Sequence, residues 1–188
     1  MNNISFTSIL TPVTKNEFFK ISASIGYDSV VDYPYSVSSS VVKQNVRTNN
    51  ICDCTACLVT DGEKALLMHL LPSTSANHDT NRVYNYISQN FNLHNNNNLQ
   101  AVLVGSHMYK ASQNIINNFI KFFNKFKIPT TILKTGLSPT DIAYKTSTDK
   151  VYITNNEITE ALRKGKSKTE ALNSGFNYTK ISEADEIK

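Results

Sequence analysis

The sequence lacks several features that would identify a class of protein at once. Among its 188 residues there are only 3 cysteines, all between Cys52 and Cys57, so they do not form a disulfide framework. No apolar run approaches the roughly 20 residues that cross a membrane, and the N-terminus has no basic region followed by an apolar stretch, as a Sec signal would. We therefore expect no membrane insertion and a cytoplasmic location at synthesis, with export into a host cell left open.

The chain also lacks a strong excess of charge. Its net charge is +4, and lysine and arginine are spread along the chain rather than gathered with aromatic residues, which argues against nucleic acid as a partner. With 40% hydrophobic residues and no internal repeat, residues 1–188 are expected to form one monomeric domain.

Apolar periodicity predicts helices and strands in mixed order. Helical spacing indicates helices at 77–91 and 109–127, the second with Ile116, Phe119, Ile120 and Phe123 on its buried face. Strand-like segments do not alternate regularly with these helices, so the expected class is α+β. The remaining predicted elements are strands at 38–46, 57–60, 64–69, 99–105 and 128–136, a hairpin of 142–146 with 151–154, and helices at 157–164 and 168–173.

The segment most suggestive of chemistry is ICDCTACLVTDGEKALLMHLLP, residues 51–72. Cys57 begins one predicted strand and His69 ends the next, and Asp61-Gly62 between them is typical of a tight hairpin turn. A thiol beside an imidazole is the minimal set for nucleophilic catalysis, because the imidazole removes the thiol proton and then stabilises the thiolate. A zinc site of the three cysteines with His69 is an alternative, although no second CxxC pair accompanies it. We expect no metal and no cofactor.

Together with later motifs, this segment resembles the chemoreceptor glutamine deamidases of the CheD type. The residues that carry the resemblance are CTAC (54–57), HLLP (69–72) and GSHM (105–108), which stand for the family's Gly-Ser-Cys, His-x-x-Leu-Pro and Gly-Gly-Ala-x-Met. The toxin deamidases, cytotoxic necrotizing factor and Burkholderia lethal factor, have a similar catalytic core. The twelve-residue step from Cys57 to His69 looks more like that of the lethal factor.

The resemblance implies a β-sandwich flanked by helices and a cysteine-dependent protein-glutamine deamidase. It covers about 40–155, which would be the catalytic core, with an N-terminal addition and a C-terminal helix and tail. Cys57 would attack the carboxamide of an exposed glutamine in a protein substrate, and His69 would transfer the protons. The lethal-factor-like spacing favours a bacterial effector or toxin that acts on a host protein. The alternatives are a chemoreceptor deamidase and a non-catalytic binding module on the same fold.

The sequence departs from the family beside the predicted nucleophile. The chemotaxis enzymes and the lethal factor have a threonine six residues before the cysteine, where its hydroxyl orients the histidine, whereas this chain has Ile51. The main-chain carbonyl of Ile51 or Asn50 is the expected substitute, with the side chains of Asn50 and Thr48 as alternatives. Backbone N–H groups of a turn at Thr55-Ala56, with that of Cys57, would bind the oxyanion.

Hairpin geometry sets a condition on the predicted dyad. A strict two-residue turn at Asp61-Gly62 would place Cys57 opposite Leu66 and turn His69 to the other face of the sheet. We therefore predict a bulge or bend in this hairpin. It would bring the Cys57 Sγ within about 4 Å of a His69 ring nitrogen.

Overall fold

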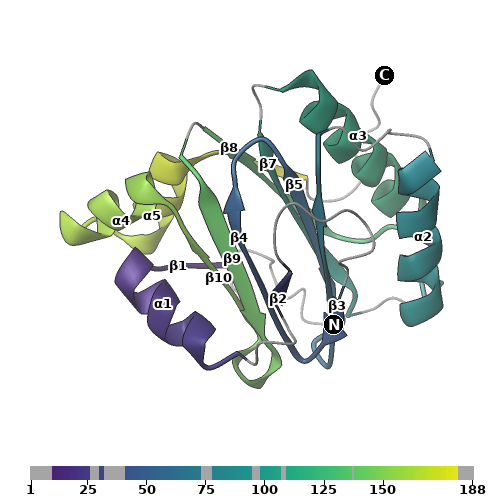
Figure 1. The fold of residues 1–188 in the computed structure, drawn as a ribbon, viewed down its shortest axis with the longest axis horizontal. Helices are drawn as coiled ribbons and strands as arrows, with labels where there is room; N and C mark the ends of the chain where they lie inside the picture. The colour runs from purple at the N-terminus through teal and green to yellow at the C-terminus, as the bar shows by residue number, and fades with distance from the viewer. Residues whose placement is uncertain are drawn as a thin grey trace.

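Two β-sheets pack face to face, and helices cover both outer faces (Figure 1). The computed structural model describes residues 10–25, 30–31, 41–72, 78–94, 98–106, 109–136 and 138–181. The class is α+β with a sandwich of sheets, as the sequence predicts.

The first sheet has five strands in the order β1-β10-β9-β4-β2. Its centre is the antiparallel ladder of β4, β9 and β10, and the two edge strands pair in parallel with their neighbours. The predicted hairpin of 142–146 with 151–154 is confirmed as β9 and β10. The strands are β1 (Leu10–Pro12), β2 (Val30–Val31), β4 (Asn45–Ile51), β9 (Thr140–Lys145) and β10 (Lys150–Thr154).

The second sheet has six strands in the order β11-β8-β7-β5-β6-β3. Its central strand β5 pairs antiparallel with both β6 and β7, and β7 runs parallel to β8. Short apolar segments without polar alternation form these strands, as expected where both faces of a sheet are covered. The strands are β3 (Val41–Lys43), β5 (Thr55–Thr60), β6 (Ala65–Leu70), β7 (Gln100–Ser106), β8 (Thr130–Thr135) and β11 (Phe176–Ile181).

Helices form the outer layers. On the right of Figure 1, α2 and α3 lie against the second sheet, and on the left α1, α4 and α5 lie beside the first. The helices are α1 (Lys15–Ala23), α2 (His78–Asn90), α3 (Lys110–Lys125), α4 (Asn156–Arg163) and α5 (Lys168–Gly175), with a 3-10 turn η4 (Thr146–Thr148) between β9 and β10.

Four strands of the second sheet, β5 to β8, each contribute to two different cores. Residues of one parity, such as Ala56 and Leu58, pack between the sheets with β4, β9 and β10. Residues of the other parity, such as Cys57 and Val59, pack under α2 and α3. A third, smaller cluster joins α1 to the outer face of the first sheet through Phe18. Alternation along one strand therefore decides which layer a side chain enters.

Helix α3 confirms the strongest helix prediction. It spans Lys110–Lys125 and has Tyr109 as its N-cap residue. Ile116, Phe119 and Phe123 are buried, and Ile120 is partly buried against the same cluster. This aromatic stripe packs on the sheet.

Two sequence predictions differ from the structure. The strand predicted at 38–46 is divided near Gln44, so that β3 joins the second sheet and β4 the first. The segment predicted as a tail after 173 instead continues as α5 to Gly175 and then as strand β11 beside β8. In both places a short polar interruption marks a change of element that apolar periodicity does not reveal.

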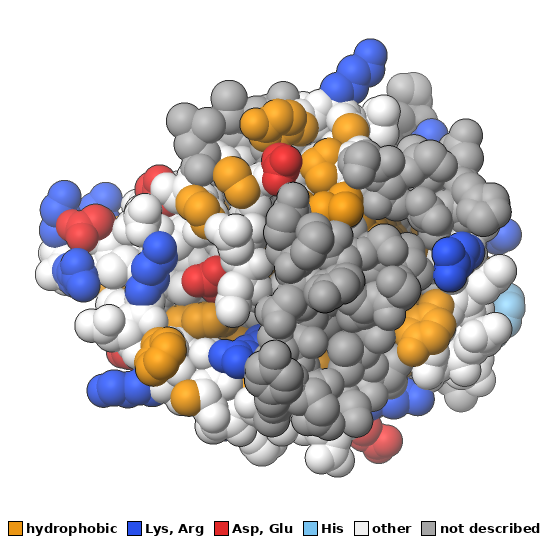
Figure 2. Space-filling model, viewed as in Figure 1, with side chains coloured by type: hydrophobic (Ala, Val, Ile, Leu, Met, Phe, Trp, Pro, Cys, Tyr) orange, Lys and Arg blue, Asp and Glu red, His pale blue; other side chains and the backbone are white. Residues whose placement is uncertain are grey.

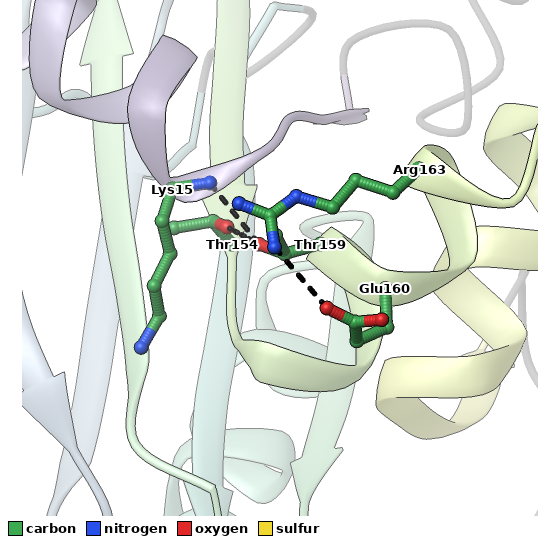
Figure 3. Close-up of polar contacts among 5 residues, drawn as sticks. All are labelled: Lys15, Thr154, Thr159, Glu160 and Arg163. Atoms are coloured by element: carbon green, nitrogen blue, oxygen red, sulfur yellow. Dashed lines mark hydrogen bonds and ion pairs between the residues drawn. The ribbon is translucent and has the colours of Figure 1, made fainter.

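Polar contacts tie the start of α1 to the end of β10 and to α4 (Figure 3). The Lys15 backbone N–H donates to Thr159 Oγ1 at 3.1 Å, and that oxygen lies 3.3 Å from Thr154 Oγ1. Arg163 and Glu160 form an exposed ion pair at 3.2 Å on the same helix, a kind of contact that adds little stability. The buried threonine pair therefore fixes this corner more than the ion pair does.

The described surface is mixed in charge. On the face drawn in Figure 2, lysine and arginine side chains are spread around the rim with aspartate and glutamate among them. Within the described residues, no helix is long and apolar enough to span a membrane.

Candidate functional site

A histidine and a threonine from opposite sheets meet inside the sandwich. His69 of β6 and Thr48 of β4 are both fully buried, and His69 Nδ1 lies 2.8 Å from Thr48 Oγ1. His69 pairs across the strands with Ala56, a residue of the core between the sheets, which fixes the face from which its side chain projects. The bond holds the imidazole ring in one orientation.

Cys57 lies on the opposite face of the same sheet. It pairs with Met68, and both belong to the apolar cluster under α2 and α3. Its side chain has 0% exposure, and burial raises the pKa of the thiol well above its usual range. Because successive residues of a strand point to opposite faces, Cys57 points away from the face of its neighbour Ala56, which is also the face of His69. The predicted Cys57–His69 dyad is therefore wrong.

The hairpin explains this correction. The loop between β5 and β6 has four residues, Asp61–Lys64, closed by the Asp61 N–H to Lys64 carbonyl bond at 3.3 Å. Compared with a two-residue turn it shifts the pairing by two residues, which changes the partner of Cys57 but not its face. The pairing runs without interruption from Thr55–Leu70 to Thr60–Ala65, so the bulge predicted here is absent and nothing carries His69 across the sheet.

The other predicted site residues are also corrected. The Nδ1 partner of His69 is the Thr48 side chain, one of the alternatives, rather than the carbonyl of Ile51, whose own side chain is buried between the sheets. Thr55 and Ala56 do not form an oxyanion turn. They lie in β5, which is paired on both sides.

Cys54 lies in the bend that joins β4 to β5, next to an acidic side chain. It is 1% exposed. Its Sγ contacts Asp53 Oδ1 at 3.6 Å, and the buried Ser112 of α3 donates a short hydrogen bond to the Asp53 carbonyl. Burial, the Asp53 carboxylate and the nearby Cys52 together raise the pKa of Cys54 to about 12. The thiol is therefore protonated at neutral pH in this conformation.

Cys54 is close in sequence to the strand that carries the partner of His69. It lies in the bend just before β5 begins at Thr55, two residues before Ala56, which pairs with His69. Strand β4, which carries Thr48, ends at Ile51 on the other side of this bend. Cys57, in contrast, lies on the face of β5 that packs under α2 and α3.

The sequence contains a signal for this arrangement. Thr48 stands six residues before Cys54, which is the threonine-to-cysteine spacing of the chemotaxis enzymes and the lethal factor. Counted back from Cys57, the same spacing falls on Ile51. Of these two cysteines, only Cys54 has a threonine six residues before it.

The metal alternative finds no support in the geometry. Cys57 lies across the sheet from His69, and the part of the chain that the structure describes contains no cluster of three His, Cys, Asp or Glu side chains suited to a metal ion. His107 and Met108 of the GSHM motif lie outside the described residues.

Comparison with known proteins adds no assignment. No protein-family model matches the chain, and no curated protein matches its sequence.

Proposed function

We propose that the chain is a cysteine-dependent protein-glutamine deamidase in which Cys54, rather than Cys57, is the nucleophile. The observation that carries this proposal is the bond between His69 and Thr48, because Thr48 stands at the spacing before Cys54 that the resemblance requires. His69 is the general base and Thr48 orients it. The substrate is a glutamine side chain exposed on another protein.

The chemistry needs only these groups and water. With Nδ1–H donated to Thr48, the Nε2 lone pair of His69 takes the Cys54 proton as sulfur attacks the carboxamide carbon. The C–N bond breaks and the imidazolium gives its proton to the departing ammonia. Water, deprotonated by His69, then attacks the thioester, the C–S bond breaks, and glutamate and the Cys54 thiol are released.

Because the pKa of Cys54 is raised, substrate binding has to change the surroundings of its thiol before the thiol can react. The thiol donates to Asp53 in the free protein, so it has to leave this carboxylate and turn to His69 before it can react. Catalytic hydrogen bonds are often poorly aligned without substrate and tighten when it binds. The bend at 52–54 has to open as well, because Cys54 is almost completely covered. Its backbone N–H groups are the natural donors for the oxyanion.

The burial of Cys54 also favours a second candidate function, a non-catalytic binding module on this fold. A covered thiol with a pKa of about 12 is a poor nucleophile unless the bend moves. With Cys54 as the nucleophile, the step to His69 is 15 residues rather than twelve. The spacing argument for a lethal-factor-like toxin therefore no longer applies. A bacterial effector and a chemoreceptor enzyme are then equal alternatives.

Cysteine substitutions test the proposal directly. Ammonia release from carbobenzoxy-glutaminyl-glycine and from unfolded casein is measured, and the casein peptides are analysed for the gain of about 1 Da that accompanies replacement of NH₂ by OH. We expect Cys54→Ser and His69→Ala to abolish both signals, whereas Cys52→Ser keeps them.

Cys57→Ala is the matched control, since it removes the neighbouring thiol from the other face of the sheet. It should retain activity per folded molecule. Loss of activity with Cys57→Ala but not with Cys54→Ser would overturn the assignment, and a wild-type protein inactive on both substrates would favour the binding module.

A further inference from the structure

Strand β4 contains a bulge between Thr48 and the bend that carries Cys54. Thr48 lies opposite Ile142 of β9, but Ile51 lies opposite Thr140. Two residues of β4, Asn49 and Asn50, therefore face the single residue between them on β9. This extra residue is the defining feature of a β-bulge.

The bulge is held by one carboxylate. Asn50 has φ of 60°, a left-handed conformation that is uncommon for residues other than glycine, although asparagine tolerates it best. Its N–H donates to Asp141 Oδ1 at 2.8 Å. The side chain opposite the bulge thus accepts a hydrogen bond from the residue with the unusual backbone.

The bulge changes which residues of β4 point into the sandwich. Val46 and Thr48 point into the sandwich, and simple alternation would turn Asn50 inward next and Ile51 outward. Instead Asn50 is exposed and Ile51 is fully buried. The extra residue shifts the alternation by one position before the chain enters the bend. The placement of Cys54 relative to Thr48 therefore depends on it.

We propose that Asp141 is a positioning residue of the site, which holds the β4 bulge through Asn50 and so keeps Thr48 and Cys54 in register around His69. Its effect on turnover rests on the proposed function, whereas its effect on the orientation of His69 does not. Asp141 and Asn50 take no part in bond breaking. They fix the path of the chain between two groups that do.

The surroundings of Asp141 suit a structural carboxylate. It pairs across β9 and β10 with Thr154, whose hydroxyl contacts Thr159 at the start of α4 (Figure 3). Burial raises the pKa of Asp141, while the Asn50 N–H and the positive charge of Lys15 partly oppose that shift. The carboxylate thus has a backbone donor and a nearby cation on the first turn of α1.

The test is a rescue experiment built on the conformational freedom of glycine. Asp141→Ala removes the acceptor, and the double variant Asp141→Ala/Asn50→Gly supplies a residue that adopts positive φ without help. Glu160→Ala is the control, because it removes an exposed carboxylate of α4 that pairs with the exposed Arg163. The measurements are the ¹⁵N signals of the His69 ring, kcat and KM for carbobenzoxy-glutaminyl-glycine, and circular dichroism to confirm folding.

We expect Asp141→Ala to lower kcat by about tenfold or more with little change in KM, because small misplacements of catalytic groups are costly. The His69 ring signals should move toward those of Thr48→Val. The double variant should recover both, and Glu160→Ala should change neither. A folded Asp141→Ala protein with unchanged His69 signals and kcat would overturn the proposal, as would a double variant no better than the single one.

A second pair of variants covers a failure of Asp141→Ala to fold. Asn50→Gly should keep the His69 signals, whereas Asn50→Val should shift them, since a β-branched residue resists positive φ. Equal signals in these two variants would overturn the proposal. A wild-type protein without ammonia release would remove the proposed function but leave the ring signals as a test of positioning.

Discussion

Cys54 and Cys57 are three positions apart in the sequence but have different surroundings. Cys57 is buried in the apolar cluster under α2 and α3, while Cys54 lies in the bend before β5, beside the Asp53 carboxylate. A third thiol, Cys52, is partly exposed in the same bend as Cys54. The three cysteines should therefore differ sharply in reactivity.

Alkylation of the native protein measures this difference. Iodoacetamide reacts with the thiolate, so at pH 8 Cys54, whose pKa is raised to about 12, should react slowly and continue to accelerate as the pH rises above 9. Asp53→Asn removes the carboxylate that stabilises the protonated thiol. The substitution should lower the pKa of Cys54, and each pH unit by which it falls should speed alkylation of Cys54 about tenfold.

Peptide mass spectrometry after timed labelling assigns the sites. Cys52 should be labelled first because it is the most exposed, and Cys57 should remain unlabelled until urea unfolds the chain. Glu63→Gln removes one negative charge, as Asp53→Asn does, but from an exposed position in the β5–β6 loop. It should leave the rate of alkylation at Cys54 unaltered. Labelling of Cys57 in the folded protein would contradict the burial on which its exclusion rests.

At the scale of elements, apolar periodicity predicts where the helices and buried strands lie, but it does not predict which sheet each strand joins. The stripe of α3 and the short apolar run of β7 are strong signals because each buries one continuous surface. The boundary between β3 and β4 carries no such signal, since the residues on both sides of it are equally suited to a strand. Only pairing with β6 in one sheet and β9 in the other separates them.

The candidate site was predicted only in part for a related reason. His69 and its strand were found from sequence, and the parity problem with Cys57 was visible in the hairpin. The bulge expected in that hairpin is absent. A different bulge, which the sequence did not indicate, lies in β4 beside Asn50. A bulge depends on the partner strand, here on Asp141 some ninety residues away, so a local pattern does not locate it.

Helices α4 and α5 pack closely against each other at Gly175. Gly175 ends α5, and a Cβ built there would lie 2.6 Å from Ile158 Cγ1 and 3.0 Å from the Asn155 side-chain amide. Asn155 is the buried N-cap of α4, and its Nδ2 donates to the Gly175 carbonyl at 3.2 Å. Alanine would therefore disturb both the helix contact and the cap.

Gly175→Ala should lower the free energy of unfolding by about 1–3 kcal/mol through overpacking, more than the gain of up to about 1 kcal/mol in helix propensity. Gly136→Ala is the matched control, because a Cβ there meets nothing within 4 Å, and it should stay within about 0.5 kcal/mol of wild type. Urea denaturation measures both. Equal stabilities would show that α4 and α5 separate easily.

At the scale of the whole molecule, the second sheet divides two tasks between its faces. Its outer face makes an apolar core with α2 and α3, and its inner face meets the first sheet, where His69 and Thr48 are joined. Adjacent residues of β6 therefore serve different layers. Met68 belongs to the apolar core and His69 to the candidate site, although they are neighbours in the chain.

Substitution of these two neighbours should separate stability from activity. Met68→Ala removes a buried side chain from a close-packed cluster and should lower the free energy of unfolding by about 2–5 kcal/mol. Ammonia release per folded molecule should stay within about twofold, because the backbone of β6 and the inner face are unchanged.

His69→Gln should give the opposite result. It keeps a polar side chain of similar size near Thr48, so the loss of stability should be about 1–3 kcal/mol, whereas removal of the proposed general base should lower kcat by about 10²-fold or more. Urea denaturation and ammonia release from carbobenzoxy-glutaminyl-glycine are compared on the same protein preparations. A Met68→Ala protein that stays folded but loses turnover would mean that the two faces of the sheet are coupled, and the division of tasks between layers would then be wrong.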